Sequence, residues 1–177
     1  MIVFGERMDF AALMSAEVTQ IIARHGLEPL PWEGGYFRRT WTSPENLPVP
    51  AGRPAGTAIL YLMTPTGFSA LHVLDADELW RYQAGDPAQH VSMDPASGAV
   101  RVTLLGPDLH EGHESQLVVP AGVWQGARPL PGGAKGWALV AATMTPGWDP
   151  AGFILGDPRL LQQRFPGAGE WIRKFSR

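Results

Sequence analysis

The sequence contains no cysteine. Disulfide bonds and thiolate chemistry are therefore excluded, and any metal ion would have to be held by imidazole, carboxylate or amide groups. No apolar run approaches the roughly 18 residues that a membrane-spanning helix needs. The N-terminal stretch MIVFGERMDFAALM is a poor signal peptide, because charges interrupt its short apolar segment and no basic region precedes it. We therefore expect a cytoplasmic protein without a membrane partner.

Lysine is scarce, since only Lys135 and Lys174 contribute to the 14 basic residues, and the arginines are scattered along the chain. With 17 acidic residues the formal net charge is −3. This pattern lacks the basic patch of a nucleic-acid-binding surface, so we expect no nucleic-acid partner. The length of 177 residues suits one domain with a real core. We predict residues 1–15 as an N-terminal extension and residues 16–177 as a single domain, with a first helix within residues 1–14 as the alternative.

Glycine (21 residues) and proline (17 residues) are abundant, and they punctuate short segments that are rich in β-branched and aromatic residues. Such a pattern is typical of short strands joined by turns. We predict strands over residues 36–43, 57–64, 68–74, 78–84, 89–93, 100–105, 116–119, 123–128, 137–145 and 153–155. Because strands and helices do not alternate, the expected fold class is an all-β antiparallel sandwich or barrel.

Short helices are expected near the two ends of the chain. Ser15 is the predicted N-cap of the first helix, which carries an apolar stripe at helical spacing and ends at His25 and Gly26. Asp157 followed by Pro158 predicts the start of a second helix, which should stop at Pro166-Gly167.

Several longer motifs follow one another in a fixed order: EGGYFRRT, GTAILYLM, FSALHVLDADELWRYQAGD, VVPAGVWQGA and GWALVAATMTPGWDPAGFIL. In these motifs the chain resembles the Cupin_5 family, small RmlC-like cupins filed as a domain of unknown function. The resemblance spans about residues 16–165. The resemblance implies a double-stranded β-helix, or cupin jelly roll, whose conical barrel encloses a pocket, with short flanking helices. It also implies a homodimer.

The resemblance assigns His72 to the first metal-ligand position of the general cupin motif and Glu78 to its carboxylate. Leu74 stands where a second histidine is expected, and Gln125 stands where the last histidine is expected. One imidazole, one carboxylate and one neutral amide make a weak site for transition metals. We therefore expect no cofactor, with a weakly held divalent metal at His72, Glu78 and Gln125 as the alternative.

Strand alternation predicts which side chains share a face. It places His72 with Leu74 and Glu78 with Trp80 and Tyr82, and in the cupin register these faces line the barrel interior. A carboxyl group ringed by Trp and Tyr should have a raised pKa. The predicted catalytic pair is His72 and Glu78, and the predicted substrate-binding residues are Arg38, Trp80, Tyr82 and Gln125. Trp41 is a further candidate for stacking a flat ring.

Each of these assignments has a structural alternative. His72 would then be a hydrogen-bonded strand residue, Glu78 a partner in a salt bridge at the rim, Gln125 a buried amide that ties strands together, and Arg38 a member of a surface ion pair. The other four histidines are predicted in caps and loops: His25, His90, His110 and His113.

Three functions compete. The first is a metal-independent isomerase or epimerase that acts by acid–base chemistry on a small polar or aromatic molecule, with His72 and Glu78 as the proton-transfer pair and Arg38 as the anchor. The second is a binding module for a small molecule without chemistry. The third is a weak metal-dependent enzyme that uses His72, Glu78 and Gln125. The missing imidazoles favour the first two.

Overall fold

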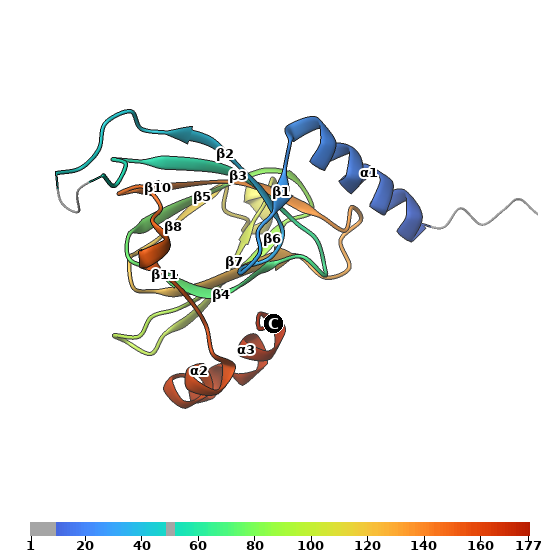
Figure 1. The fold of residues 1–177 in the computed structure, drawn as a ribbon. Helices are drawn as coiled ribbons and strands as arrows, with labels where there is room; N and C mark the ends of the chain where they lie inside the picture. Colours follow the sequence, from blue (N-terminus) through green and yellow to red (C-terminus); the bar gives the residue numbers. More distant parts are fainter. Residues whose placement is uncertain (1–9, 49–51) are drawn as a thin grey trace, which may run out of the picture.

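The structure is a computed structural model that describes residues 10–48 and 52–177, and its body consists of two antiparallel β-sheets that face each other (Figure 1). The six-stranded sheet has, in spatial order, β1 (Glu28–Pro29), β2 (Tyr36–Thr42), β3 (Thr57–Met63), β10 (Ala138–Thr145), β5 (Asp77–Gly85) and β8 (Gln116–Val119). The five-stranded sheet has β11 (Phe153–Leu155), β4 (Ser69–Leu74), β9 (Trp124–Pro129), β6 (Ala88–Met93) and β7 (Val100–Leu105). The predicted all-β jelly roll is confirmed.

All ten predicted strands are present, and their ends differ from the prediction by no more than one residue. The agreement has a simple cause, because Gly, Pro and Asp in the turns interrupt segments that fit a pleated, half-buried surface. The prediction missed the short β1, whose two residues carry no strand pattern of their own, and the 3₁₀ turns η1 (Leu109–Glu111), η2 (Pro150–Gly152) and η3 (Pro166–Ala168).

Helix α1 (Phe10–His25) covers the outer face of the six-stranded sheet (Figure 1). It begins before Ser15, so the predicted N-cap there is wrong: the apolar residues that precede Ser15 continue the helix. The predicted end is confirmed, since Gly26 has a φ of 59° and the N–H of Leu27 donates to the carbonyl of Ile22 at 3.0 Å. Residues 1–9 of the predicted extension lie outside the described residues.

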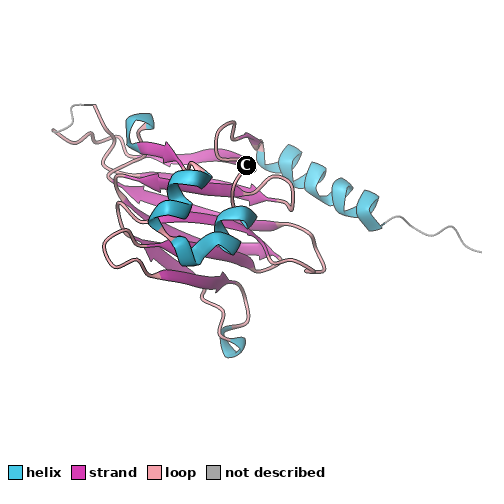
Figure 2. Ribbon diagram, turned by 90° about the horizontal axis from the view of Figure 1, so that it is seen from below, coloured by secondary structure: helices cyan, strands magenta, loops and turns pink. Residues whose placement is uncertain are grey.

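The C-terminal helices α2 (Pro158–Arg164) and α3 (Gly169–Lys174) lie across the outer face of the five-stranded sheet (Figure 2). The Asp157 carboxylate caps α2 by accepting from the N–H of Arg159 at 2.8 Å, as predicted. The prediction missed α3 because Pro166-Gly167 was taken as the end of helical structure. Instead, the chain turns there and buries Ile172 and Phe175 against the sheet.

The space between the sheets is filled at one end and hollow at the other. Along β3, Met63 lies in the packed core, whereas Thr57 and Ile59 face a cavity. Tyr61 and Trp80 meet edge to face, with ring centroids 6.0 Å apart, and form the floor between the two ends. Across residues 10–48 and 52–177, no helix is both long enough and apolar enough to cross a membrane.

Replacing Phe175 by Ala should lower the free energy of unfolding by about 3–5 kcal/mol, because this fully buried ring holds α3 on the sheet and its loss leaves a cavity. Urea unfolding measures the change. Leu160→Ala on the neighbouring helix is the control, since Leu160 is 64% exposed and its truncation should cost less than about 0.5 kcal/mol. Equal effects of the two changes would contradict this packing.

Candidate functional site

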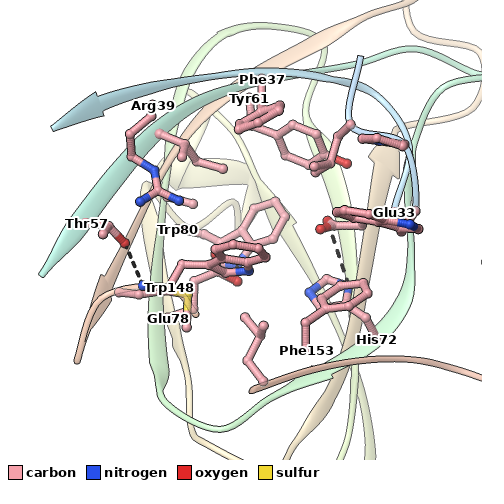
Figure 3. A pocket seen from close by; sticks show the side chains of 17 residues that line it. Glu33, Phe37, Arg39, Thr57, Tyr61, His72, Glu78, Trp80, Trp148 and Phe153 are labelled. Atoms are coloured by element: carbon pink, nitrogen blue, oxygen red, sulfur yellow. Dashed lines mark hydrogen bonds and ion pairs between the residues drawn. The ribbon is translucent and has the colours of Figure 1, made fainter. Parts of the chain in front are cut away.

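The hollow end of the barrel is a cavity of about 170 Å³ (Figure 3). The exposed Trp32 is among the residues that line it. Strand alternation selects the side chains that face it. They are Phe37 and Arg39 on β2, Ile59 and Tyr61 on β3, His72 and Leu74 on β4, Glu78 and Trp80 on β5, and Ala142 and Met144 on β10. Glu33, Trp148 and Phe153 complete the wall from loops and β11. The walls are therefore mostly apolar, with a few polar groups among them.

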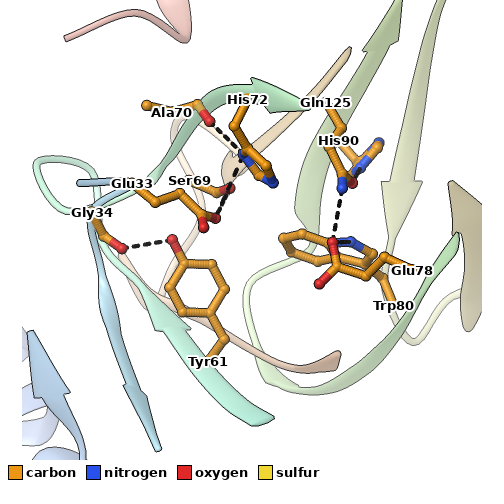
Figure 4. Close-up of polar contacts among 10 residues, drawn as sticks. All are labelled: Glu33, Gly34, Tyr61, Ser69, Ala70, His72, Glu78, Trp80, His90 and Gln125. Carbon is orange, nitrogen blue, oxygen red and sulfur yellow. Dashed lines mark hydrogen bonds and ion pairs between the residues drawn. The ribbon is translucent and has the colours of Figure 1, made fainter. Parts of the chain in front are cut away.

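Glu78 is the buried acid of this cavity, with 7% of its surface exposed. Its Oε2 accepts hydrogen bonds from Trp80 Nε1 at 2.9 Å and from Gln125 Nε2 at 2.8 Å (Figure 4). Within the described part of the chain, no hydrogen bond engages Oε1. Burial raises the pKa of Glu78 to about 7, although the nearby His72 and the two donors lower it. Near neutral pH this carboxyl group can therefore give or accept a proton at Oε1.

Behind Glu78, two buried side chains fix the direction of its hydrogen bonds. His90 Nε2 lies 3.1 Å from Gln125 Oε1, and burial lowers the pKa of His90 to about 4. The imidazole is therefore neutral at pH 7 and donates to the amide oxygen, which leaves the amide nitrogen of Gln125 to donate to Glu78. The prediction that His90 lies in a cap or loop is wrong, because it sits inside β6 with 1% exposure.

His72 faces the same cavity from β4. Its Nδ1 lies 2.8 Å from the carbonyl oxygen of Ala70, which can only accept, so in the neutral ring Nδ1 carries the proton and the basic lone pair lies on Nε2. The ring stacks on Phe153 with centroids 5.4 Å apart. This arrangement holds the ring plane and the tautomer that a general base needs.

Glu33 is a site residue that the sequence reasoning missed. Its Oε1 lies 3.8 Å from His72 Nδ1 and accepts a hydrogen bond from the Ser69 hydroxyl (Figure 4). The carboxylate thus sits where it would stabilise a protonated His72. The signal was present, because Glu33 opens the motif EGGYFRRT.

The arginine at the cavity is Arg39, not the predicted Arg38. Arg38 is exposed on the outer side of β2, next to Gly26, because successive side chains of a strand point to opposite faces. Arg39 points inward, and burial lowers its pKa. Among the described residues, its guanidinium has no ion pair and its buried Nε has no hydrogen-bond partner. It lies 5.9 Å from the centre of the Trp148 ring.

The other predicted residues fall into two groups. Trp80 lines the cavity, and Gln125 reaches it through Glu78. Tyr82 lies on the far side of the floor, where its hydroxyl donates to the carbonyl of Gly85 at 2.7 Å and its ring packs in the core. Trp41 is 49% exposed and lies outside the cavity. Only part of the predicted set is thus brought together.

The donors at this site do not suit a transition metal. Across residues 10–48 and 52–177, no group of three His, Asp or Glu side chains could hold an ion. Leu74 lines the cavity at the position of the second imidazole. The oxygen of Gln125 is turned to His90, and Glu78 Oε2 already accepts two hydrogen bonds. What remains is one imidazole nitrogen and separate carboxylate oxygens, a poor match for ligand sets rich in imidazole.

Comparison with known proteins gives a consistent picture. The family described as Cupin_5, cupin superfamily (DUF985), matches residues 19–156. The uncharacterised protein YML079W of Saccharomyces cerevisiae is 30% identical over 130 residues, which are 66% of this chain and 64% of the yeast protein's length.

Solved structures agree with that family. A hypothetical protein from Leishmania major has a TM-score of 0.80 at 30% identity, covering 88% of this chain and 96% of that one. A protein from Shewanella oneidensis has a TM-score of 0.81 at 28% identity, covering 89% and 96%. Oxalate decarboxylase from Bacillus subtilis has a TM-score of 0.53 at 16% identity, covering 85% of this chain and 37% of that one, and shows the fold alone.

Glu78→Gln should stabilise the protein at high pH. Since the folded-state pKa of about 7 exceeds the ordinary 4.5, folding takes up a proton between these values, so the stability of the unsubstituted protein falls as pH rises through this range. The free energy of unfolding of the variant minus that of the unsubstituted protein should rise by about 3 kcal/mol between about pH 4 and about pH 8.5, as measured by urea unfolding. Glu111→Gln, at an exposed position, is the control. A difference between Glu78→Gln and the unsubstituted protein that does not change with pH would refute the raised pKa.

Proposed function

Because the chain belongs to the Cupin_5 family of the cupin superfamily (DUF985), whose barrel here encloses a cavity, we propose that it binds a small anionic molecule there and isomerises or epimerises it by acid–base chemistry. The observation that carries the proposal is the pair of His72 and Glu78 in one secluded cavity. One has a basic ring nitrogen, and the other has a pKa of about 7. A general acid and a general base in one cavity are the groups that catalyse proton transfer in enzymes.

The position of Arg39 supports the proposal that the ligand is an anion. Among the described residues the half-buried guanidinium has no ion pair, and the nearby Trp148 ring compensates only weakly for its loss of water. A carboxylate or phosphate would supply that compensation through two parallel hydrogen bonds. The anchor that we predicted at Arg38 is thus proposed for Arg39, one residue further along the same strand.

The size of the cavity limits the ligand. Its volume of about 170 Å³ is close to that of an engineered protein cavity of about 150 Å³ that accommodates benzene. The buried part of the ligand is therefore a single ring or a short chain. The floor of Tyr61 and Trp80 prevents deeper entry.

The proposed step begins with a carbon that lies next to a carbonyl group. The His72 Nε2 lone pair takes a proton from this carbon, and the electrons of the broken C–H bond form a C=C bond. At the same time, protonated Glu78 gives its Oε1 proton to the carbonyl oxygen. The products of this step are a neutral enol, an imidazolium and a carboxylate. Glu33 stabilises the imidazolium through His72 Nδ1, 3.8 Å from its Oε1.

The return step completes the reaction. Glu78 takes a hydroxyl proton from the enol, and His72 returns its proton to carbon. When the intermediate is a 1,2-enediol, loss of the proton of its second hydroxyl group to Glu78 and protonation of the other carbon by His72 move the carbonyl group. Inversion of configuration requires the enol to turn over in the cavity, so that His72 returns the proton to the opposite face of the original carbon. Both outcomes regenerate the starting enzyme, so neither needs a redox partner.

Proton exchange tests this function. Pyruvate incubated with the protein in D₂O should exchange its methyl hydrogens for deuterium faster than in buffer, as followed by proton NMR. His72→Gln and Glu78→Gln should each slow the protein-dependent exchange by about 100-fold or more, because each removes one proton-transfer group. His25→Gln, in the last turn of α1, is the matched control and should leave exchange unchanged.

Two results would contradict the assignment. If the His72→Gln variant exchanged the pyruvate hydrogens at the rate of the unsubstituted protein, His72 would be excluded as the base. Binding of pyruvate without any exchange by the unsubstituted protein would favour a binding module over an enzyme.

A further inference from the structure

A second hollow of about 240 Å³ adjoins the mouth of the barrel. It is lined by Trp32, Trp148, Pro150, Phe153 and Leu155. Trp32, Trp148 and Phe153 also line the inner cavity, so the two spaces share one wall. Trp32 is 59% exposed and Leu155 is 43% exposed, so large apolar side chains with exposed surface gather around this hollow, as is common at ligand-binding grooves.

Hydrogen bonds hold Trp148 at this mouth. The backbone N–H of Trp148 donates to Thr57 Oγ1 at 2.9 Å. The preceding carbonyl, of Gly147, accepts from Arg53 Nε at 2.6 Å, and Arg53 in turn forms two hydrogen bonds with Asp75 at 2.8 and 2.9 Å. The loop is thereby fixed to the rim of the barrel, and the indole is presented as a preformed surface.

Trp32 sits on the opposite loop, next to a residue of the inner site. Its turn is closed by the N–H of Gly34 donating to the carbonyl of Leu30 at 2.9 Å, and by the N–H of Leu30 donating to the carbonyl of Gly35 at 3.0 Å. Glu33, the next residue, reaches His72 inside the barrel. One short turn thus contributes to both hollows.

The positive charge of Arg39 lies close to both spaces. It lines the inner cavity, and its guanidinium lies 5.9 Å from the centre of the Trp148 ring, within reach of a cation–π contact (Figure 3). An anion held by Arg39 would therefore lie beside the aromatic wall of the outer hollow.

We propose that the outer hollow is a second compartment of the same binding site, which takes a flat ring carried by the ligand whose anionic group meets Arg39. This inference rests on the proposed function, since it places the reacting part of that ligand between His72 and Glu78. The ligand class is thus a small anionic molecule with a flat aromatic or heteroaromatic substituent. The aromatic walls favour such a ring by stacking and by the apolar area that it covers.

Two probes that differ by one phenyl group test the compartment: pyruvate and phenylpyruvate. Calorimetric titration should show that the protein binds phenylpyruvate about tenfold or more tightly than pyruvate. Trp32→Ala and Trp148→Ala should each reduce that ratio by about threefold or more. Trp41→Ala is the matched control, because Trp41 is also exposed but lies outside both hollows. Trp148→Phe, which keeps a flat ring, should retain most of the preference.

The outcomes distinguish a failure of the outer compartment from a failure of the function proposed for the inner cavity. If both probes bind equally, or if the Trp variants leave the ratio unchanged, the outer compartment is refuted while the inner site stands. Arg39→Gln should weaken both probes by the same factor. If neither probe binds at millimolar concentration, or if Arg39→Gln leaves their binding unchanged, the anionic ligand is refuted and the compartment with it.

Discussion

The buried carboxyl group of Glu78 accepts two hydrogen bonds on one oxygen, and the rest of the site is arranged around this contact. Trp80 supplies one donor and also forms the floor of the cavity with Tyr61. Gln125 supplies the other and joins the two sheets, because it lies on β9 whereas Glu78 lies on β5. Burial destabilises the charged form of the acid more than these donors stabilise it, so the pKa of Glu78 is raised to about 7 and the carboxyl group can exchange a proton at neutral pH.

Side chains fill only one end of the barrel, and the cavity that remains at the other end surrounds Glu78. Beyond Tyr61 and Trp80 the sheets are packed with apolar side chains, and on the near side the same strands line a hollow. The loops that carry Trp32 and Trp148 then extend the wall at the mouth. The few polar groups on this mostly apolar wall are held in fixed directions, which is the arrangement that the proposed proton transfer requires.

The sequence was sufficient for the strands, because turn residues and alternation are local properties. That the inner faces of β4 and β5 line the barrel, and that the pKa of Glu78 is raised, followed only with the cupin register that the family resemblance implied. The sequence alone could not establish how residues from separate strands pair. His90 was misplaced although the predicted strand over residues 89–93 already contained it. Its contact with Gln125, 35 residues away, could not be predicted because it is formed only by the pairing of β6 with β9. Glu33 was missed because loops carry no alternation. Arg38 was an avoidable error, since alternation along β2 already sets Arg39 beside Phe37 on the inner face.

The protonation of Glu78 is the central claim, and an NMR titration of carbon-labelled glutamate side chains measures it most directly, with Glu78→Gln to assign the signal. The account predicts that the Glu78 carboxyl carbon titrates with a midpoint near 7. A midpoint near the ordinary 4.5 would contradict it, because the acid would then be fully charged at neutral pH and could not serve as a proton donor.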